Sequence, residues 1–156
     1  MFHIVLIAPE IPQNTGTIGR LAVCTGASLH LIRPLGFSLD ASRIRRAGLD
    51  YWQHLDVSVY DDWEQFLALR KPARMIFASA HGTRTVYETG FEDGDWLIFG
   101  NEGHGLPEPF YSRYRKVLFR IPMPGRHART HNLANAVSIV LYEALRQSEG
   151  WGKGPQ

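Results

Sequence analysis

The sequence predicts a single α/β domain in which helices flank a mostly parallel sheet. Short apolar runs alternate along the chain with helical patterns, an order typical of β-α-β units. The apolar runs are continuous rather than alternating with polar residues, as strands buried on both faces require. The 156 residues suit one domain with one hydrophobic core, and we see neither an internal repeat nor a linker.

The expected elements follow from these runs and from the residues that bound them. We expect strands over residues 3–8, 29–32, 55–60, 75–78, 96–99 and 117–121. We expect helices over residues 15–25, 43–52, 63–70 and 133–147. Asn14 or Thr15 is predicted to cap the first helix, and Asp61 and Asp62 the third. The domain is expected to span residues 1–147, with residues 148–156 as a short frayed tail.

The last helix has one apolar stripe and two further apolar residues. The stripe has helical spacing and is the expected core face: Leu133, Ala136, Val137, Val140, Leu141, Ala144 and Leu145. Ile139 and Tyr142 lie off that stripe, three residues apart and therefore next to each other. They are either scattered surface residues or a second buried face against another copy of the chain.

Composition excludes several classes of protein. Hydrophobic residues make up 44% and charged residues 21%, the balance of a globular protein. No apolar run approaches the ~20 residues that span a bilayer, and the first residues lack the features of a signal peptide. The single cysteine, Cys24, excludes an intrachain disulfide, favours the cytoplasm and is expected to be buried. A net charge of +2 permits nucleic-acid binding without demanding it.

The common catalytic motifs are missing. No dinucleotide-binding glycine pattern follows the first strand, and there is no phosphate-binding loop, metalloprotease motif, paired-cysteine motif or nucleophile elbow. His127 and His131 stand four residues apart in a loop, with no acidic or cysteine partner nearby. We therefore expect no metal site.

Three loops have features beyond those of simple connections. Residues 9–20 join the first strand to the first helix and place glycines in its first turns, and residues 100–107 hold three glycines directly after an apolar strand. Residues 121–136 form a long polar loop that leads into the last helix. Glycines allow a ligand to approach the backbone closely, and long loops in compact domains tend to be functional. Taken singly, each loop could still be a tight turn, and Thr130, Asn132 and Asn135 could simply cap the helix.

Together these segments resemble a known family. The patterns N-T-G-x-I-x-R at 14–20, G-x-E-x-x-G-L-P at 100–107 and I-P-M…N-L-x-N-A-V-S at 121–138 are similar to the three motifs of SPOUT-class RNA methyltransferases. Within that class the chain most resembles the small, single-domain tRNA (cytidine/uridine-34-2′-O)-methyltransferases, the TrmL or YibK-like group. The resemblance extends from residue 1 to about 147 and includes R-I-R-R-A-G-L-D-Y at 43–51.

The resemblance implies a fold and a cofactor. It implies a C-terminal trefoil knot, which no periodicity could indicate, and a homodimer, which agrees with the second face at Ile139 and Tyr142. It also implies a site for S-adenosyl-L-methionine. By the match, the residues that line this site or lie close to it are Ala78, Gly100, Glu102, Gly105, Ile121, Met123, Thr130 and Asn132.

The chain departs from relatives at a few positions. Thr130 and Ala134 stand where many relatives have serine, so a hydroxyl is kept at the first position and lost at the second. Asn101 stands where this group commonly has proline, and the third motif is one residue longer around residues 125–128. None of these departures affects Arg20, Glu102 or Asn132.

The implied reaction moves a methyl group from a sulfonium to a ribose 2′-oxygen. The resemblance indicates Arg20 as the activating residue. Because a guanidinium rarely loses its proton, we expect Arg20 to stabilise the developing alkoxide rather than act as a base. Asn14, Glu102, Thr130 and Asn132 are expected to orient Arg20 and the cofactor. The residues expected to bind RNA are Arg43, Arg45, Arg46, Arg126 and Arg129.

The implied substrate is the wobble nucleotide of a tRNA. Two alternatives share the motifs: a 2′-O-methyltransferase of another tRNA or rRNA site, and a non-catalytic RNA-binding dimer on the same fold. The absence of an added RNA-binding domain favours a small target such as an anticodon stem-loop, and intact Arg20, Glu102 and Asn132 favour catalysis.

Overall fold

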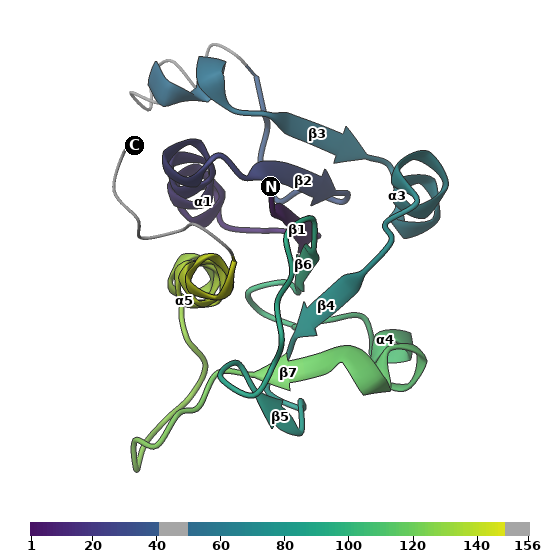
Figure 1. The fold of residues 1–156 in the computed structure, drawn as a ribbon. Helices are drawn as coiled ribbons and strands as arrows, with labels where there is room; N and C mark the ends of the chain where they lie inside the picture. The colour runs from purple at the N-terminus through teal and green to yellow at the C-terminus, as the bar shows by residue number, and fades with distance from the viewer. Residues whose placement is uncertain (41–49, 149–156) are drawn as a thin grey trace.

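A computed structural model describes residues 1–40 and 50–148 of the chain. Within these residues, seven strands form one sheet in the order β3-β2-β1-β6-β4-β7-β5 (Figure 1). The strands are β1 (His3–Ile7), β2 (Ser28–Ile32), β3 (Val57–Tyr60), β4 (Met75–Ala78), β5 (Arg84–Thr85), β6 (Trp96–Phe99) and β7 (Leu118–Arg120). Every pairing between these strands is parallel, so the predicted sheet is confirmed.

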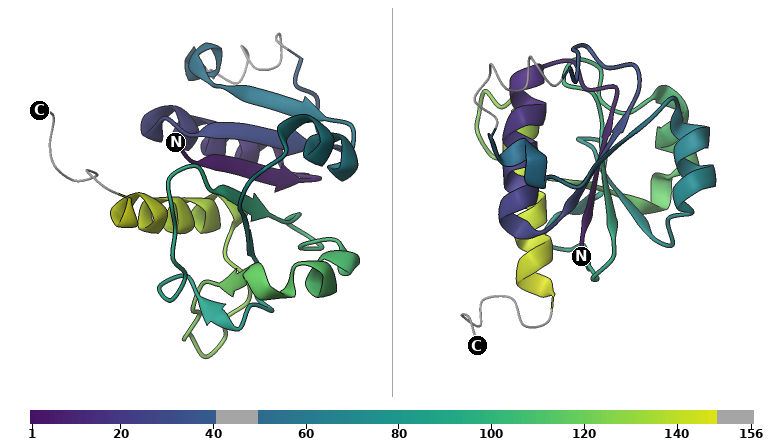
Figure 2. Two further views of the ribbon diagram at one scale, coloured as in Figure 1. Left: turned by 45° about the vertical axis from the view of Figure 1, so that its right-hand side comes forward. Right: turned by 90° about the horizontal axis from the view of Figure 1, so that it is seen from above.

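Helices cover both faces of this sheet (Figures 1 and 2). One face packs against α1 (Pro12–Thr25) and α5 (Leu133–Gln147), with Leu6, Leu29 and Phe99 in the shared core. The other packs against α3 (Trp63–Arg70) and α4 (Glu108–Arg113), where Phe66, Phe77 and Phe110 are buried together. Two short 3-10 helices, η1 (Asp50–His54) and η2 (Arg115–Val117), complete the described elements.

Most predicted elements are confirmed, and the differences have local causes. The strand expected over residues 55–60 begins only at Val57. Strand β5 and helix α4 were not predicted, because both are too short to show a periodic pattern. Of the helix expected over residues 43–52, the structure describes the last part as η1, and residues 43–49 lie outside the described residues. The tail from residue 149 onward lies outside them too.

The start of α1 differs from the prediction. The helix begins at Pro12 with Ile11 as its N-cap, so the predicted caps at Asn14 and Thr15 are wrong. Proline suits the first helical turn because its missing N–H would have no helical partner there. Of the other predicted caps, Asp62 and Asn132 are confirmed and Asp61 is wrong: Asp62 accepts a hydrogen bond from the Gln65 amide, and Asn132 from the Asn135 amide.

The apolar stripe of α5 faces the core as predicted. Val137, Val140, Leu141 and Ala144 are fully buried, whereas Ala136 is only partly buried. Off the stripe, Ile139 is partly buried and Tyr142 is 46% exposed. The face that could meet a second copy is therefore open in the single chain.

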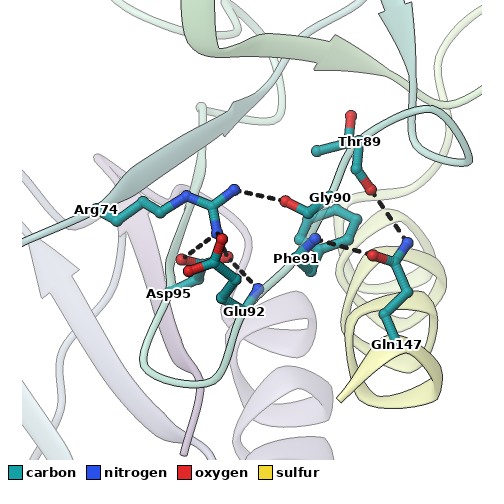
Figure 3. A network of polar contacts seen from close by, with 7 residues as sticks. All are labelled: Arg74, Thr89, Gly90, Phe91, Glu92, Asp95 and Gln147. Atoms are coloured by element: carbon teal, nitrogen blue, oxygen red, sulfur yellow. Dashed lines mark hydrogen bonds and ion pairs between the residues drawn. The ribbon is translucent and has the colours of Figure 1, made fainter. Parts of the chain in front are cut away.

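A polar network fastens α5 to the loop between β5 and β6 (Figure 3). The Gln147 side chain accepts a hydrogen bond from the Phe91 amide at 2.9 Å and donates one to the Thr89 carbonyl at 3.1 Å. Asp95, at the end of the same loop, pairs through its carboxylate with Arg74, which precedes β4, at 3.1 Å. Burial raises the pKa of Asp95, while hydrogen bonds and the charge of Arg74 oppose that rise. The Gln147 contacts fix the C-terminal end of α5, whose other end follows the long loop that begins after β7.

Candidate active site

The three loops singled out in the sequence meet at one cavity of about 570 Å³, here called the loop cavity. It lies beyond the carboxyl ends of β1, β4, β6 and β7, where parallel sheets bind ligands. Its volume falls in the range typical of small-molecule and cofactor sites. Its lining includes every residue assigned to the cofactor from the motifs: Ala78, Gly100, Glu102, Gly105, Ile121, Met123, Thr130 and Asn132.

Three side chains connect the three motifs at the wall of the loop cavity. The Glu102 carboxylate accepts hydrogen bonds from the backbone amides of Glu10 at 2.8 Å and Ile11 at 3.1 Å, and from the Asn14 side-chain amide at 3.4 Å. The Asn132 side-chain amide then donates to Asn14 Oδ1 at 2.9 Å. Residues far apart in the sequence thus form a single chain of contacts, here called the loop network: Glu102, Asn14 and Asn132.

Glu102 also explains how α1 can begin without a capping side chain. Helix α1 has no acidic residue in its first turn and no side-chain cap of its own. The carboxylate of Glu102, from another loop, supplies the negative charge that a helix N-terminus favours. Partial burial acts to raise the pKa of Glu102, but the hydrogen bonds from Glu10, Ile11 and Asn14 outweigh it and leave the pKa lowered. Glu102 is therefore a charged anchor rather than a proton donor at neutral pH.

The second loop is a tight hairpin that needs its glycines. Asn101 and Gly105 exchange two backbone hydrogen bonds of 2.9 Å. A Cβ atom at Gly100 would lie 2.2 Å from the carbonyl carbon of Gly105, and Gly105 itself has φ +71°. The Asn101 side chain adds further bonds, because its amide donates to the Ala8 carbonyl and its oxygen accepts from the Gly103 and His104 amides. Asn101 thus ties the hairpin to the end of β1.

The SpoU rRNA methylase family matches residues 1–142 of the chain. The chain belongs to this family. It is 46% identical over 151 residues to the tRNA (cytidine(34)-2′-O)-methyltransferase of Acidovorax sp. strain JS42, covering 95% of this chain and 93% of the relative. The resemblance to SPOUT methyltransferases inferred from the motifs is therefore confirmed.

Two solved structures relate the fold to function. One, described as giving structural insights into the 2-OH methylation of C/U34 on tRNA, has a TM-score of 0.86 and 49% identity, covering 94% of this chain and 95% of that one. The other is an AdoMet-bound rRNA methyltransferase from Sinorhizobium meliloti, with a TM-score of 0.78 and 27% identity. It matches 93% of this chain but only 56% of the longer Sinorhizobium chain.

Arg20, the residue to which the SpoU-family motifs assign activation, does not line the loop cavity. It is exposed on α1, and its guanidinium carbon lies 5.1 Å from the centre of the Tyr51 ring, within range of a cation–π contact. The Tyr51 hydroxyl donates to the Gly16 carbonyl on the same helix. Burial raises the pKa of Tyr51, against the lowering effect of the Arg20 charge. Arg20 is thus held in place without closing the cavity of its own chain.

The remaining predicted residues fall in three places. Asn14 and Thr130 line the loop cavity, where Asn14 is buried and Thr130 is exposed. Arg126 and Arg129 are exposed in the third loop. The other residues expected to bind RNA lie outside the described residues: Arg43, Arg45 and Arg46.

Sequence reasoning missed several residues of the cavity wall. Residues 79–81 line it directly after β4, and Tyr111 of α4 lines it as well. The position of residues 79–81 could have been a signal, because they follow a strand that the sequence did predict. Tyr111 carried no such signal, since α4 itself was not expected.

Three other predictions bear on the site. Cys24 is exposed, so its expected burial is wrong; it lies on the outward side of α1 while Ile18 and Ala22 face the core. In the part of the chain that the structure describes, no group of three or more His, Cys, Asp or Glu side chains could hold a metal ion. No helix among the described residues has the length and apolar character that a membrane span needs.

Proposed function

We propose that this protein is an S-adenosyl-L-methionine-dependent tRNA 2′-O-methyltransferase that acts on the ribose of the wobble nucleotide. The observation that carries the proposal is the loop cavity with its loop network, in a chain 46% identical to a tRNA (cytidine(34)-2′-O)-methyltransferase. Glu102, Asn14 and Asn132 are the residues that the family motifs assign to the site, and they are in contact through hydrogen bonds.

The cavity suits the cofactor in size and in the character of its wall. Gly100, Gly103 and Gly105 line the wall without side chains, so a flat nucleoside can approach the backbone of this loop closely. Ile121, Met123 and Leu133 add apolar surface, while Thr130 and Asn132 add polar groups. When bound, S-adenosylmethionine supplies an electrophilic methyl group on a sulfonium.

The chain's own residues would position the acceptor and stabilise its charge. A ribose hydroxyl is weakly acidic, so its oxygen needs a donor that stabilises the alkoxide as it forms, while the hydroxyl proton passes to solvent water. Arg20 provides a permanently charged donor and can also hold the adjoining phosphate by two parallel hydrogen bonds. The loop network fixes the start of α1, the helix that holds Arg20. Much of the rate enhancement would then come from alignment of oxygen, methyl carbon and sulfur.

We propose a homodimer that uses the Ile139 and Tyr142 side of α5. This side is partly open in the single chain, and α5 packs beside α1, which carries Arg20. A second copy on this face could bring Arg20 near the loop cavity of its partner, since Arg20 does not line its own. Replacing Tyr142 with aspartate should weaken association, because an unpaired charge would be buried. Unchanged dimer sedimentation at low concentration would contradict this interface.

Three finer features stay predictions from the family and the substrate. The trefoil knot is expected from family membership. Cytoplasmic location is expected from the tRNA substrate. We expect methyl transfer to require no metal ion, because the sulfonium is already an electrophile; activity in the presence of a chelator tests this point.

The proposal is tested with the purified protein, S-adenosylmethionine labelled on its methyl group and an anticodon stem-loop RNA. We expect label to enter the RNA, and a matched RNA with a 2′-deoxyribose at the wobble position to accept none. Equal labelling of both RNAs, or none of either, would reject the proposal.

A second candidate substrate is a ribose of rRNA or of another tRNA site. It is favoured by the family's own description and by the Sinorhizobium rRNA methyltransferase neighbour. Mapping 2′-O-methylation across tRNA and rRNA in a strain lacking the gene distinguishes the two, because only the modified nucleotide loses its methyl group.

A further inference from the structure

A second cavity, of about 790 Å³, adjoins the loop cavity and differs from it in charge. The two share His81 and Tyr111 in their linings, so they meet at these residues. We call the second cavity the basic groove, because its charged lining among the described residues consists of Arg84, Arg115, Lys116 and a single carboxylate, Glu108.

The cations of the basic groove come from the free edge of the sheet. Arg84 lies on the edge strand β5, and Arg115 and Lys116 lie on η2, which precedes β7. The Arg120 side chain donates to the carbonyls of Gly82 at 3.0 Å and Thr83 at 2.7 Å, which holds the segment leading to β5. The wall that presents Arg84 is therefore anchored before any ligand binds.

The positive charges of the basic groove are not neutralised by ion pairs among the described residues. Arg113 pairs with Glu64, Arg146 with Glu143 and Arg74 with Asp95. By contrast, Arg115 and Lys116 are exposed and form no ion pair within residues 1–40 and 50–148. Arg84 acts electrostatically on Glu88 without forming an ion pair there. Three adjacent, mostly unneutralised cations attract a polyanion.

The charge of the groove does not suit the methyl donor. S-Adenosylmethionine has a sulfonium, an ammonium and a carboxylate but no phosphate, so it is a net cation that these residues would repel. A phosphodiester backbone has the opposite charge, and Arg and Lys are the usual contacts to its phosphates. The groove therefore fits the other substrate of the proposed reaction.

We propose that the basic groove binds the phosphodiester backbone of the RNA next to the target nucleotide. This inference rests on the proposed function and adds a second RNA-binding surface to the arginines predicted from the sequence. At the junction with the loop cavity, the rings of His81 and Tyr111 lie 4.9 Å apart, edge to face. Aromatic faces at such a point suit stacking of an unpaired base, as in single-stranded RNA recognition.

The test compares single charge reversals in full-length protein: Arg84→Glu, Arg115→Glu and Lys116→Glu. Lys71→Glu is the matched control, with the same charge change on an exposed lysine that has no ion pair among the described residues. Lys71 ends α3 and precedes the amino end of β4, whereas the loop cavity lies beyond the carboxyl end of that strand. Dissociation constants for tRNA are measured at several salt concentrations, and cofactor affinity by titration.

We expect each groove reversal to weaken tRNA binding about tenfold at low salt. Each should also reduce, by about one, the slope of the logarithm of the binding constant against the logarithm of the salt concentration. Lys71→Glu should change binding less than about twofold, and all four variants should bind the cofactor normally. Glu108→Gln removes the one carboxylate that the structure places in the groove lining and should tighten tRNA binding.

Two results would overturn the inference while leaving the proposed function intact. In the first, the wild type methylates tRNA, but all three groove reversals bind tRNA as tightly as the wild type or as Lys71→Glu does. The other is a loss of cofactor affinity in the reversals as large as their loss of tRNA affinity, since the groove would then belong to the cofactor site. Failure of the wild type to methylate any tRNA would instead reject the proposed function.

Discussion

Two networks of polar side chains in this protein differ in what they face. The loop network joins Glu102, Asn14 and Asn132 across three loops, at the wall of a cavity. A second network crosses the sheet itself: His3 contacts Ser28 at 2.6 Å, and His30 contacts Ser28 at 2.9 Å and Tyr60 at 2.8 Å. We call this second set the strand network.

The two networks differ in whether their polar groups are paired inside the fold or face a cavity. In the strand network, both nitrogens of His30 have partners, Ser28 on its own strand and Tyr60 on the adjacent strand β3, and Ser28 and His30 are buried. Burial, with the nearby His3 and Arg70, lowers the pKa of His30 to about 3, so the ring is neutral. The loop network keeps a charged carboxylate beside open space. A polar cluster thus lies inside the fold in one place and lines a cavity in the other.

The largest expected effect concerns Arg20, which belongs to neither network. Arg20→Ala should lower the rate of methyl transfer at least ~100-fold, because loss of a charged donor to the transition state costs on the order of 3 kcal/mol. Cofactor binding should stay nearly normal, since Arg20 does not line the loop cavity. Arg20→Lys should also be poor, because an ammonium cannot make the planar two-point contact.

Single-turnover rates and cofactor titrations on each variant measure the effect on methyl transfer separately from the effect on cofactor binding. A near-normal rate in Arg20→Ala, or a failure caused only by lost cofactor binding, would show that Arg20 has another role. Mixing Arg20→Ala with Asn132→Ala tests the dimer as well. If each site combines residues of two copies, mixed dimers should regain part of the activity.

The next effect breaks the loop network itself. Asn132→Ala removes the contact to Asn14 and the cap of α5, so it should weaken cofactor binding roughly tenfold and also slow methyl transfer. The matched control is Asn135→Ala, which changes an exposed asparagine of the same helix that does not line the cavity. Equal losses in the two variants would mean that the Asn132 contacts with Asn14 and with the start of α5 do not govern cofactor binding.

The residues of the loop network could be predicted from the sequence, whereas the strand network could not. The loop network was accessible because its residues belong to motifs with fixed spacing, even though 88 positions separate Asn14 from Glu102. The strand network was not accessible, because in the sequence His3 and His30 are only polar residues within strands. The pairing of β1 with β2 brings His3 to Ser28, and the pairing of β2 with β3 brings His30 to Tyr60. Likewise, the cap of α1 was assigned to its nearest polar residues, since no local pattern reveals a carboxylate arriving from Glu102.

A smaller effect, on the pH dependence of folding stability, is expected from the strand network. Unfolded His30 has a pKa near 6.5 and folded His30 a pKa of about 3, so the unfolded chain binds the extra proton between these values. Stability should therefore fall as the pH drops below 6.5, by about 2 kcal/mol between pH 8 and pH 5 from this residue. The pKa of His3 is also lowered by burial and acts in the same direction. Denaturant unfolding at both pH values measures the loss.

The control is His30→Gln, which cannot take up the proton. It should be less stable than the wild type at pH 8 but should lose less stability on acidification. A wild type that is equally stable at pH 8 and pH 5 would contradict the assignment of a neutral, buried His30.

The smallest expected effect concerns Asn101, which supports the loop network from outside. Its amide donates to the Ala8 carbonyl at 2.6 Å, and its oxygen holds the Gly103 amide at 2.7 Å. Asn101→Ala removes both contacts but keeps the backbone pairing with Gly105, so it should cost about 1 kcal/mol, or about fivefold in cofactor affinity. Asn101→Asp keeps the acceptor but replaces the donor with a carboxylate oxygen that faces the Ala8 carbonyl, which adds a repulsion. Titration of the cofactor should therefore rank affinities as wild type, then Asn101→Ala, then Asn101→Asp. Wild-type affinity in both variants would mean that the Asn101 side chain does not support the loop cavity.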